Sequence, residues 1–141
     1  ALGGQAAVAN ARIAYEMFEE AFGAVLDQAD EPRVQRPLWA STSTKNPAYP
    51  DTKYIDELVA PHTVNTMPLD TIDAYQDHGN PSPEAFGDQD IEDAHRRLAR
   101  LEDLGISYDD VVATLEREGV EKFAASWQQL MDDVERKVQS S

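Results

Sequence analysis

A serine and a lysine, Ser41 and Lys45, stand at and just beyond the end of a short apolar run at residues 37–42. The run opens with a proline and turns abruptly polar at its far end, so we expect a short, mostly buried strand. Lysine is a compact cationic donor and serine a neutral one, and together they could hold a phosphate group. From the residue types alone, a solvated loop lysine and a turn serine are an equal alternative.

A second, β-branched run at residues 63–67 carries Asn65 and Thr66 toward its end. These are weaker pocket candidates, because an asparagine at a strand end more often satisfies backbone groups of the following loop. The three histidines are scattered and the chain has no cysteine, so no set of residues has the spacing of a metal site. We therefore expect no metal ligand in this chain.

Helices predominate among the elements that must position these residues. Apolar residues recur at helical spacing in residues 5–22, 52–59, 70–78 and 120–138, and in two further segments that begin at Asp88 and Ser107. Gly23, Gly79 and Gly105 are expected to end helices, and Pro68 is expected to open one. Residues 80–87 contain two prolines and a glycine and are predicted to form a loop.

The segment that begins at Ser107 is expected to be a short helix that ends before residue 120. Ser107 and Asp110 have the spacing of a capping box, with aspartate in place of the usual glutamate or glutamine. The helix at residues 120–138 is predicted to be a separate, final element with one apolar side.

Two short strands joined by a helix favour parallel pairing, because a parallel return needs a crossover connection. Parallel strands are normally covered on both faces and paired at both edges, and two strands cannot satisfy each other's outer edges. Further strands should therefore flank them, either from another part of the protein or from another copy. Trp39, inside the first strand, is expected to pack in the core.

The composition excludes several classes of partner. A net charge of −15 repels nucleic acid and anionic membranes, so a bound phosphate must be held by a local site. No apolar run approaches the roughly 18 residues of a membrane span. The absence of cysteine fits a reducing compartment, and a cytoplasmic location is expected.

The residues from 36 to 68 closely resemble the last strands of bacterial transaldolases of the longer type. Residues 7–12 resemble the helix after the sixth strand of that family, and residues 115–123 resemble its C-terminal helices. The resemblance implies that residues 1–141 are the C-terminal part of a single (β/α)8 TIM barrel, with strand seven at 38–42 and strand eight at 64–67. A complete barrel needs about 250 residues, so the chain is expected to be a mostly helical fragment of an α/β fold.

The resemblance also implies an activity without any metal or organic cofactor. Such an enzyme moves a dihydroxyacetone unit from sedoheptulose 7-phosphate or fructose 6-phosphate to an aldose phosphate, in the pentose phosphate pathway. A lysine on strand four, upstream of this chain, would form the Schiff base. Such a lysine must be partly buried, whereas Lys45 lies in a polar loop and Lys53, Lys122 and Lys137 lie in charged helical stretches. We expect no catalytic residue here and an inactive isolated chain.

In the resembling family, a serine and a basic residue after strand seven help to bind the substrate phosphate. This assigns that role to Ser41 and Lys45, with Asn65 and Thr66 as weak pocket candidates. The family commonly has glycine where Ser43 stands, so the side chain at Ser43 could alter the loop. The expected partners are sugar phosphates and either the rest of the barrel or another copy of the chain.

Two alternative interpretations remain open. The parent protein could be a fused transaldolase and glucose-6-phosphate isomerase. Alternatively, the chain could be a non-catalytic acidic helical interaction module, which would explain its charge and its amphipathic helices. The second alternative leaves the strand and loop pattern at residues 37–68 without explanation.

Overall fold

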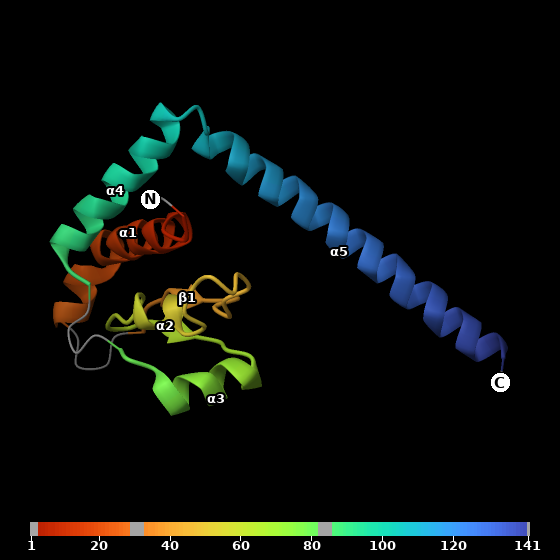
Figure 1. Ribbon diagram of the computed structural model, residues 1–141. Helices are drawn as coiled ribbons and strands as arrows, with labels where there is room; N and C mark the ends of the chain where they lie inside the picture. Colours follow the sequence, from red (N-terminus) through yellow and green to blue (C-terminus); the bar gives the residue numbers. More distant parts are fainter. Residues whose placement is uncertain (1–2, 29–32, 82–85, 141) are drawn as a thin grey trace. The chain divides into compact units, whose positions relative to one another are not determined.

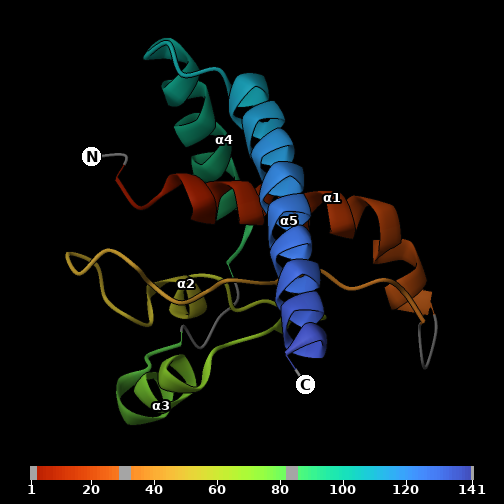
Figure 2. The ribbon, with the colours of Figure 1, turned by 90° about the vertical axis from the view of Figure 1, so that its right-hand side faces the viewer.

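The computed structural model describes residues 3–28, 33–81 and 86–140, which are mostly helical with one small sheet. The elements in chain order are α1 (Ala6–Gln28), β1 (Leu38–Trp39), α2 (Lys53–Asp56), β2 (Val64–Asn65), α3 (Leu69–His78), α4 (Asp88–Asp103) and α5 (Tyr108–Gln139) (Figure 1). They form two compact units, Ala1–Arg100 and Leu101–Ser141. In the first unit α2 lies between α1 and α3, as both ribbon views show (Figures 1 and 2).

The sheet consists of β1 and β2, which pair in parallel as predicted. Leu38 lies opposite Val64, and Trp39 lies opposite Asn65. The ladder is extended by the bond from the Val64 N–H to the Pro37 carbonyl (2.9 Å) and by the bond from the Thr66 N–H to the Trp39 carbonyl (3.1 Å). Both strands are shorter than predicted, and among the described residues each pairs with the other alone.

The core of the first unit lies between α1 and the sheet. Its buried side chains are Val8, Tyr15, Phe18, Trp39 and Leu58. The Trp39 indole N–H donates to the Leu58 carbonyl at 3.0 Å, so the polar atom of this large ring is satisfied inside the core. The prediction that Trp39 packs in the core is confirmed.

Helix α1 is longer than predicted. It continues through Gly23 to Gln28, so the expected end at Gly23 is wrong. A glycine inside a helix costs only about 1 kcal/mol relative to alanine. Phe22 and Leu26 pack against the core on either side of it, and this packing favours continued helix.

Helix α2 is a single turn, shorter than the predicted 52–59. Its buried residues include Ile55, while Leu58 is buried just after the helix ends. Helix α3 agrees with prediction to within one residue, because it begins directly after Pro68 and Gly79 follows its last residue. The predicted loop at 80–87 lies partly outside the described residues.

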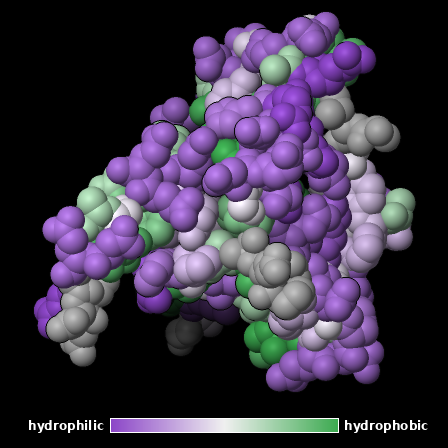
Figure 3. All heavy atoms as spheres, turned by 90° about the vertical axis from the view of Figure 1, so that its left-hand side faces the viewer, coloured by the Kyte–Doolittle hydropathy of each residue, from purple (hydrophilic) through white to green (hydrophobic). Residues whose placement is uncertain are grey.

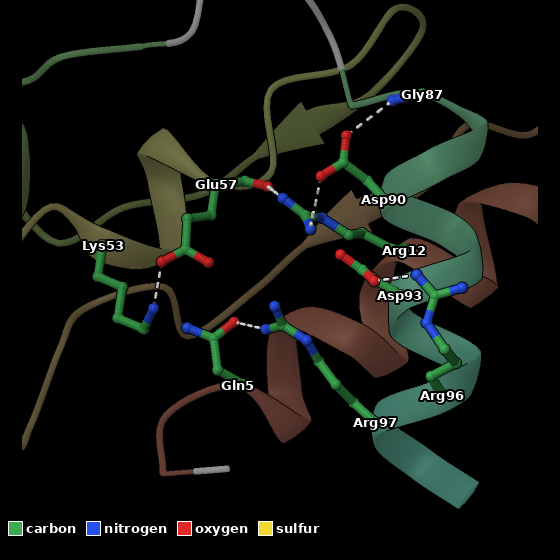
Figure 4. A network of polar contacts seen from close by, with 9 residues as sticks. All are labelled: Gln5, Arg12, Lys53, Glu57, Gly87, Asp90, Asp93, Arg96 and Arg97. Carbon is green, nitrogen blue, oxygen red and sulfur yellow. Dashed lines mark hydrogen bonds and ion pairs between the residues drawn. The ribbon is translucent and has the colours of Figure 1, made fainter. Parts of the chain in front are cut away.

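Helix α4 is fastened to α1 by polar contacts (Figure 4). The Arg12 guanidinium contacts the Asp90 carboxylate at 3.2 Å and donates to the Glu57 carbonyl at 3.2 Å. It also lies 5.4 Å from the centre of the Phe86 ring. Arg97 reaches back to Gln5 near the start of α1. Arg12 thus joins α1 to both α4 and the end of α2.

The second unit consists mainly of α5, a single helix of 32 residues. Ser107 caps it, because its hydroxyl accepts the Asp110 N–H at 3.3 Å. Gly105, with a left-handed φ of 80°, ends the preceding helix as predicted. The predicted break before residue 120 is wrong, because Gly119 continues the helix. No residue of α5 is buried in a core of its own unit.

No helix in the described part of the chain combines the length and the apolar character that a membrane crossing requires. The face drawn in Figure 3 is coloured mainly for hydrophilic residues, in keeping with the net charge of −15.

The first testable feature is the pair of carboxylates around His78 at the end of α3. The imidazole contacts Asp51 at 2.8 Å and Asp77 at 3.0 Å, and these bonds raise the pKa of His78 above its usual 6.5, with Asp51 the larger cause. A raised pKa in the folded state stabilises the fold at acidic pH, and this contribution is lost as pH rises through that pKa. NMR titration should show Asp51→Asn lowering the pKa of His78 more than Asp77→Asn. Equal shifts would contradict the assignment.

The second testable feature is Arg12, whose side chain is 14% exposed. Arg12→Lys should weaken the contact between α4 and α1. The compact ammonium of lysine cannot make the contacts with Asp90, Glu57 and Phe86 that the planar guanidinium makes at the same time. We expect amide hydrogen exchange in residues 88–100 to accelerate by about tenfold, equivalent to roughly 1.4 kcal/mol. The matched control is Arg96→Lys on the exposed side of α4, which should change exchange little. Equal effects of the two variants would refute the role of Arg12.

Candidate functional site

A cavity of about 560 Å³ opens beside the end of β1 in the first unit. One wall is the small-residue side of α1, and the other is the chain that leaves β1. Ser41 and Lys45 both line it, so the structure brings the two main candidates together. Asn65 and Thr66 are not among its lining residues. The other lining residues include Ala7, Asn10, Ala11, Trp39, Thr42, Ser43 and Asn46.

Ser41 adopts a left-handed backbone with φ 57°. This conformation costs a non-glycine residue roughly 1–2 kcal/mol and interrupts the strand. A strand alternates buried and exposed side chains, but here Trp39 is buried, Ala40 and Ser41 are both exposed, and Thr42 is buried again. Ser41 is therefore exposed, and it lines the cavity.

Thr42 connects the ends of the two strands. Its side chain is buried, and its hydroxyl donates to the Asn65 side-chain oxygen at 2.9 Å and lies 3.4 Å from the Thr66 carbonyl. The Asn65 side chain therefore contacts the side chain of Thr42, on the segment that leaves β1. Sequence reasoning did not single out Thr42. Its position next to exposed Ser41 could not be inferred from strand alternation.

Lys45 follows in an exposed loop whose turn is held by Asn46. The Asn46 side chain accepts the Ala48 N–H at 3.0 Å, and its carbonyl accepts the Tyr49 N–H at 3.1 Å. Ser43 does not have a positive φ. Its backbone conformation therefore does not require glycine, despite the glycine that is common at this place in the resembling family.

A second cavity, of about 290 Å³, adjoins the first along the same loop. Ser43 and Lys45 line both cavities, while Asp51 and Asp70 line only the second. The two spaces therefore differ in electrostatic character. A phosphate would avoid the carboxylates of the second and favour the first.

Lys53 is a buried lysine that the sequence did not reveal. Only 8% of its side chain is exposed, and its ammonium pairs with Glu57 one turn along (Figure 4). Lys53 is the first residue of the one-turn helix α2. Lys53 is not among the lining residues of either cavity.

The first cavity suits an anion. Its described lining carries one ammonium, several hydroxyls and amides, and no carboxylate, in a chain whose net charge is −15. Within the described ranges, no group of three or more histidine, aspartate or glutamate side chains is arranged to hold a metal ion. The residue types of this lining agree with the phosphate role expected for Ser41 and Lys45, which stays a prediction.

Comparison with known proteins identifies the family. Residues 1–134 match the family described as transaldolase/fructose-6-phosphate aldolase. A transaldolase of Renibacterium salmoninarum is 53% identical over 144 aligned residues, which cover 99% of this chain and 38% of the relative. Transaldolases of Arthrobacter sp. and Thermobifida fusca are each 52% identical, and the match covers 96% and 95% of this chain and 37% of each relative.

The chain therefore spans less than two fifths of the length of these relatives. The match confirms the resemblance drawn from residues 36–68 and its flanks. Because the family match extends over nearly the whole sequence, this chain belongs to the transaldolase/fructose-6-phosphate aldolase family.

Proposed function

We propose that this chain is part of a transaldolase. The enzyme would move a dihydroxyacetone unit from sedoheptulose 7-phosphate or fructose 6-phosphate to an aldose phosphate. The observation that carries the proposal is the cavity at the carboxyl end of β1. Ser41 and Lys45 both line this cavity, and its described lining contains no carboxylate, although the chain is strongly acidic.

The proposed architecture is the C-terminal part of a single (β/α)8 barrel. In it β1 and β2 are strands seven and eight, and α1 is the helix after strand six. Support comes from the parallel pairing of β1 and β2, with the one-turn helix α2 between them. The candidate residues also lie at the carboxyl ends of strands, where the active sites of such barrels are found.

The Schiff base would form on a lysine outside this chain. A reactive lysine needs a partly desolvated, neutral amine. Lys45 is exposed and Lys53 is paired with Glu57, while Lys122 and Lys137 lie on the exposed surface of α5. None of the four has the surroundings that this chemistry requires.

The role of this chain would be to hold the phosphate end of the substrate. Lys45 contributes the charge and Ser41 a directed hydroxyl donor. Together they would orient the sugar toward the Schiff-base lysine and offset the repulsion from an acidic protein. Such a contact is made equally in the ground state and the transition state, so it mainly strengthens substrate binding.

The remaining barrel segment, or another copy, is the proposed macromolecular partner. The Pro37 and Trp39 carbonyls face β2, so by strand alternation the backbone groups of Leu38 and Ala40 face the opposite edge. A groove of about 340 Å³ also lies between α1 and residues 35–39. A further strand would pair with the open edge of β1.

The apolar residues of α5 point to the same need for a partner. Phe123, Trp127 and Leu130 follow one another at helical spacing and are all largely exposed. Neither a fused isomerase nor an acidic interaction module is favoured by a specific observation. The three relatives described above are each named transaldolase.

The first test is reconstitution. The isolated chain should neither transfer dihydroxyacetone nor trap a ketose phosphate on borohydride reduction. Produced together with the part of the Renibacterium salmoninarum relative that it does not match, it should assemble and restore both reactions. Failure of that complex to transfer the unit, or a labelled substrate fixed to Lys45, would refute the proposal.

The second test uses Lys45→Ala in the reconstituted enzyme. Loss of one charge-assisted bond of roughly 1.5–3 kcal/mol should raise KM for phosphorylated acceptors by about ten- to a hundredfold, with a smaller change in kcat. Unphosphorylated acceptors should be little affected. Lys122→Ala, on the exposed face of α5, is the matched control. Equal changes in KM for phosphorylated and unphosphorylated acceptors, or no change in either, would contradict the phosphate-binding role of Lys45.

A further inference from the structure

We propose that Thr42 is a positioning residue for the phosphate site. It would hold the Ser41 hydroxyl and the loop to Lys45 in place by tying the end of β1 to the end of β2. The inference rests on the proposed phosphate role of Ser41 and Lys45. It adds a residue that makes no contact with the phosphate itself.

The contact that carries the inference is a part-buried hydrogen bond between two side chains. Only 4% of the Thr42 residue is exposed, and its hydroxyl donates to the Asn65 side chain at 2.9 Å. The Thr66 carbonyl, at 3.4 Å, is a weaker acceptor for the same proton. A hydroxyl has one proton to donate, so the Thr42 proton is committed to β2 and not to a ligand in the cavity.

The left-handed backbone of Ser41 explains why such a tie is needed. Ordinary strand alternation after buried Trp39 would turn Ser41 inward and Thr42 outward. The observed chain does the reverse, with Ser41 exposed at φ 57° and Thr42 buried. This arrangement persists only where the surroundings fix it.

Both sides of Ser41 are anchored. On one side, the Trp39 carbonyl accepts the Thr66 N–H, and the Trp39 indole donates to Leu58. On the other side, the anchor is the bond from Thr42 to Asn65. Removing this second anchor frees the chain from residue 40 onward, including the loop that carries Lys45. The Ser41 hydroxyl and the Lys45 ammonium would then lose their common orientation.

The test compares three variants in the reconstituted enzyme. Thr42→Val keeps the shape of the side chain and removes the hydroxyl, while Thr42→Ser keeps the hydroxyl. The matched control is Thr63→Val at the other end of β2, because the Thr63 hydroxyl donates to the Ala60 carbonyl at 2.7 Å away from the cavity. Kinetics should be measured with phosphorylated and unphosphorylated acceptors.

Thr42→Val should raise KM for phosphorylated acceptors by about two- to tenfold, the range of one neutral hydrogen bond. kcat and the KM for unphosphorylated acceptors should change less. Thr42→Ser and Thr63→Val should both remain near the parent values. A loss of kcat for every acceptor, a similar loss in Thr63→Val, or no rescue by serine would reduce Thr42 to a structural residue and overturn the proposal.

Asn65→Ala removes the acceptor of the same hydrogen bond. It tests the positioning role of Thr42 if Thr42→Val does not assemble. It should shift KM selectively for phosphorylated acceptors. Where Thr42→Val does assemble, the double variant should show no larger shift than the stronger single variant. Additive shifts, or an unchanged KM in Asn65→Ala, would contradict the inference. If Lys45→Ala and Ser41→Ala leave KM unchanged, or the complex is inactive, the proposed function fails and this inference fails with it. If Lys45→Ala and Ser41→Ala raise KM for phosphorylated acceptors but Thr42→Val leaves it unchanged, the inference about Thr42 fails while the proposed function stands.

Discussion

The first unit depends on the way Trp39 is held. Its carbonyl accepts a bond from β2, its ring fills the core against α1, and its indole N–H reaches the chain just after α2. One residue therefore fixes the sheet, its helical cover and the crossover between the strands. Because the carboxyl ends of both strands are then adjacent, Thr42 can reach Asn65, and the cavity has a defined wall.

The distribution of charge within the first unit fits this arrangement. Arg12 and Lys53 neutralise Asp90 and Glu57 on the side where α1 meets α2 and α4 (Figure 4). The cavity beside β1 is lined by Lys45 instead, among hydroxyl and amide groups. An acidic protein can bind an anion only where its carboxylates are kept away, and the described lining meets this condition.

Features set by local sequence were predictable, and features set by packing were not. Pro68 and Gly79 bound α3 as expected, and Ser107 caps α5, because such signals act over a few residues. Gly23 was predicted to end a helix, and a break was predicted before residue 120, yet α1 continues through Gly23 and α5 is unbroken from Tyr108 to Gln139. At the candidate site, the sequence placed Ser41 and Lys45 at and after the end of a strand, and both line the cavity there, while their phosphate role stays a prediction. The inward turn of Thr42 depends on Asn65, 23 residues away, which no local pattern records.

The sequence separation of these contacts also bears on the order in which the chain folds. Trp39 meets Leu58 across 19 residues, and Thr42 meets Asn65 across 23. By contrast, His95 meets Glu16 across 79 residues and Arg97 meets Gln5 across 92. The entropy lost on closing a loop grows with its length, so the strand pair with its crossover closes the shorter loops. The strand ends beside the first cavity can therefore organise before α4 reaches back to α1.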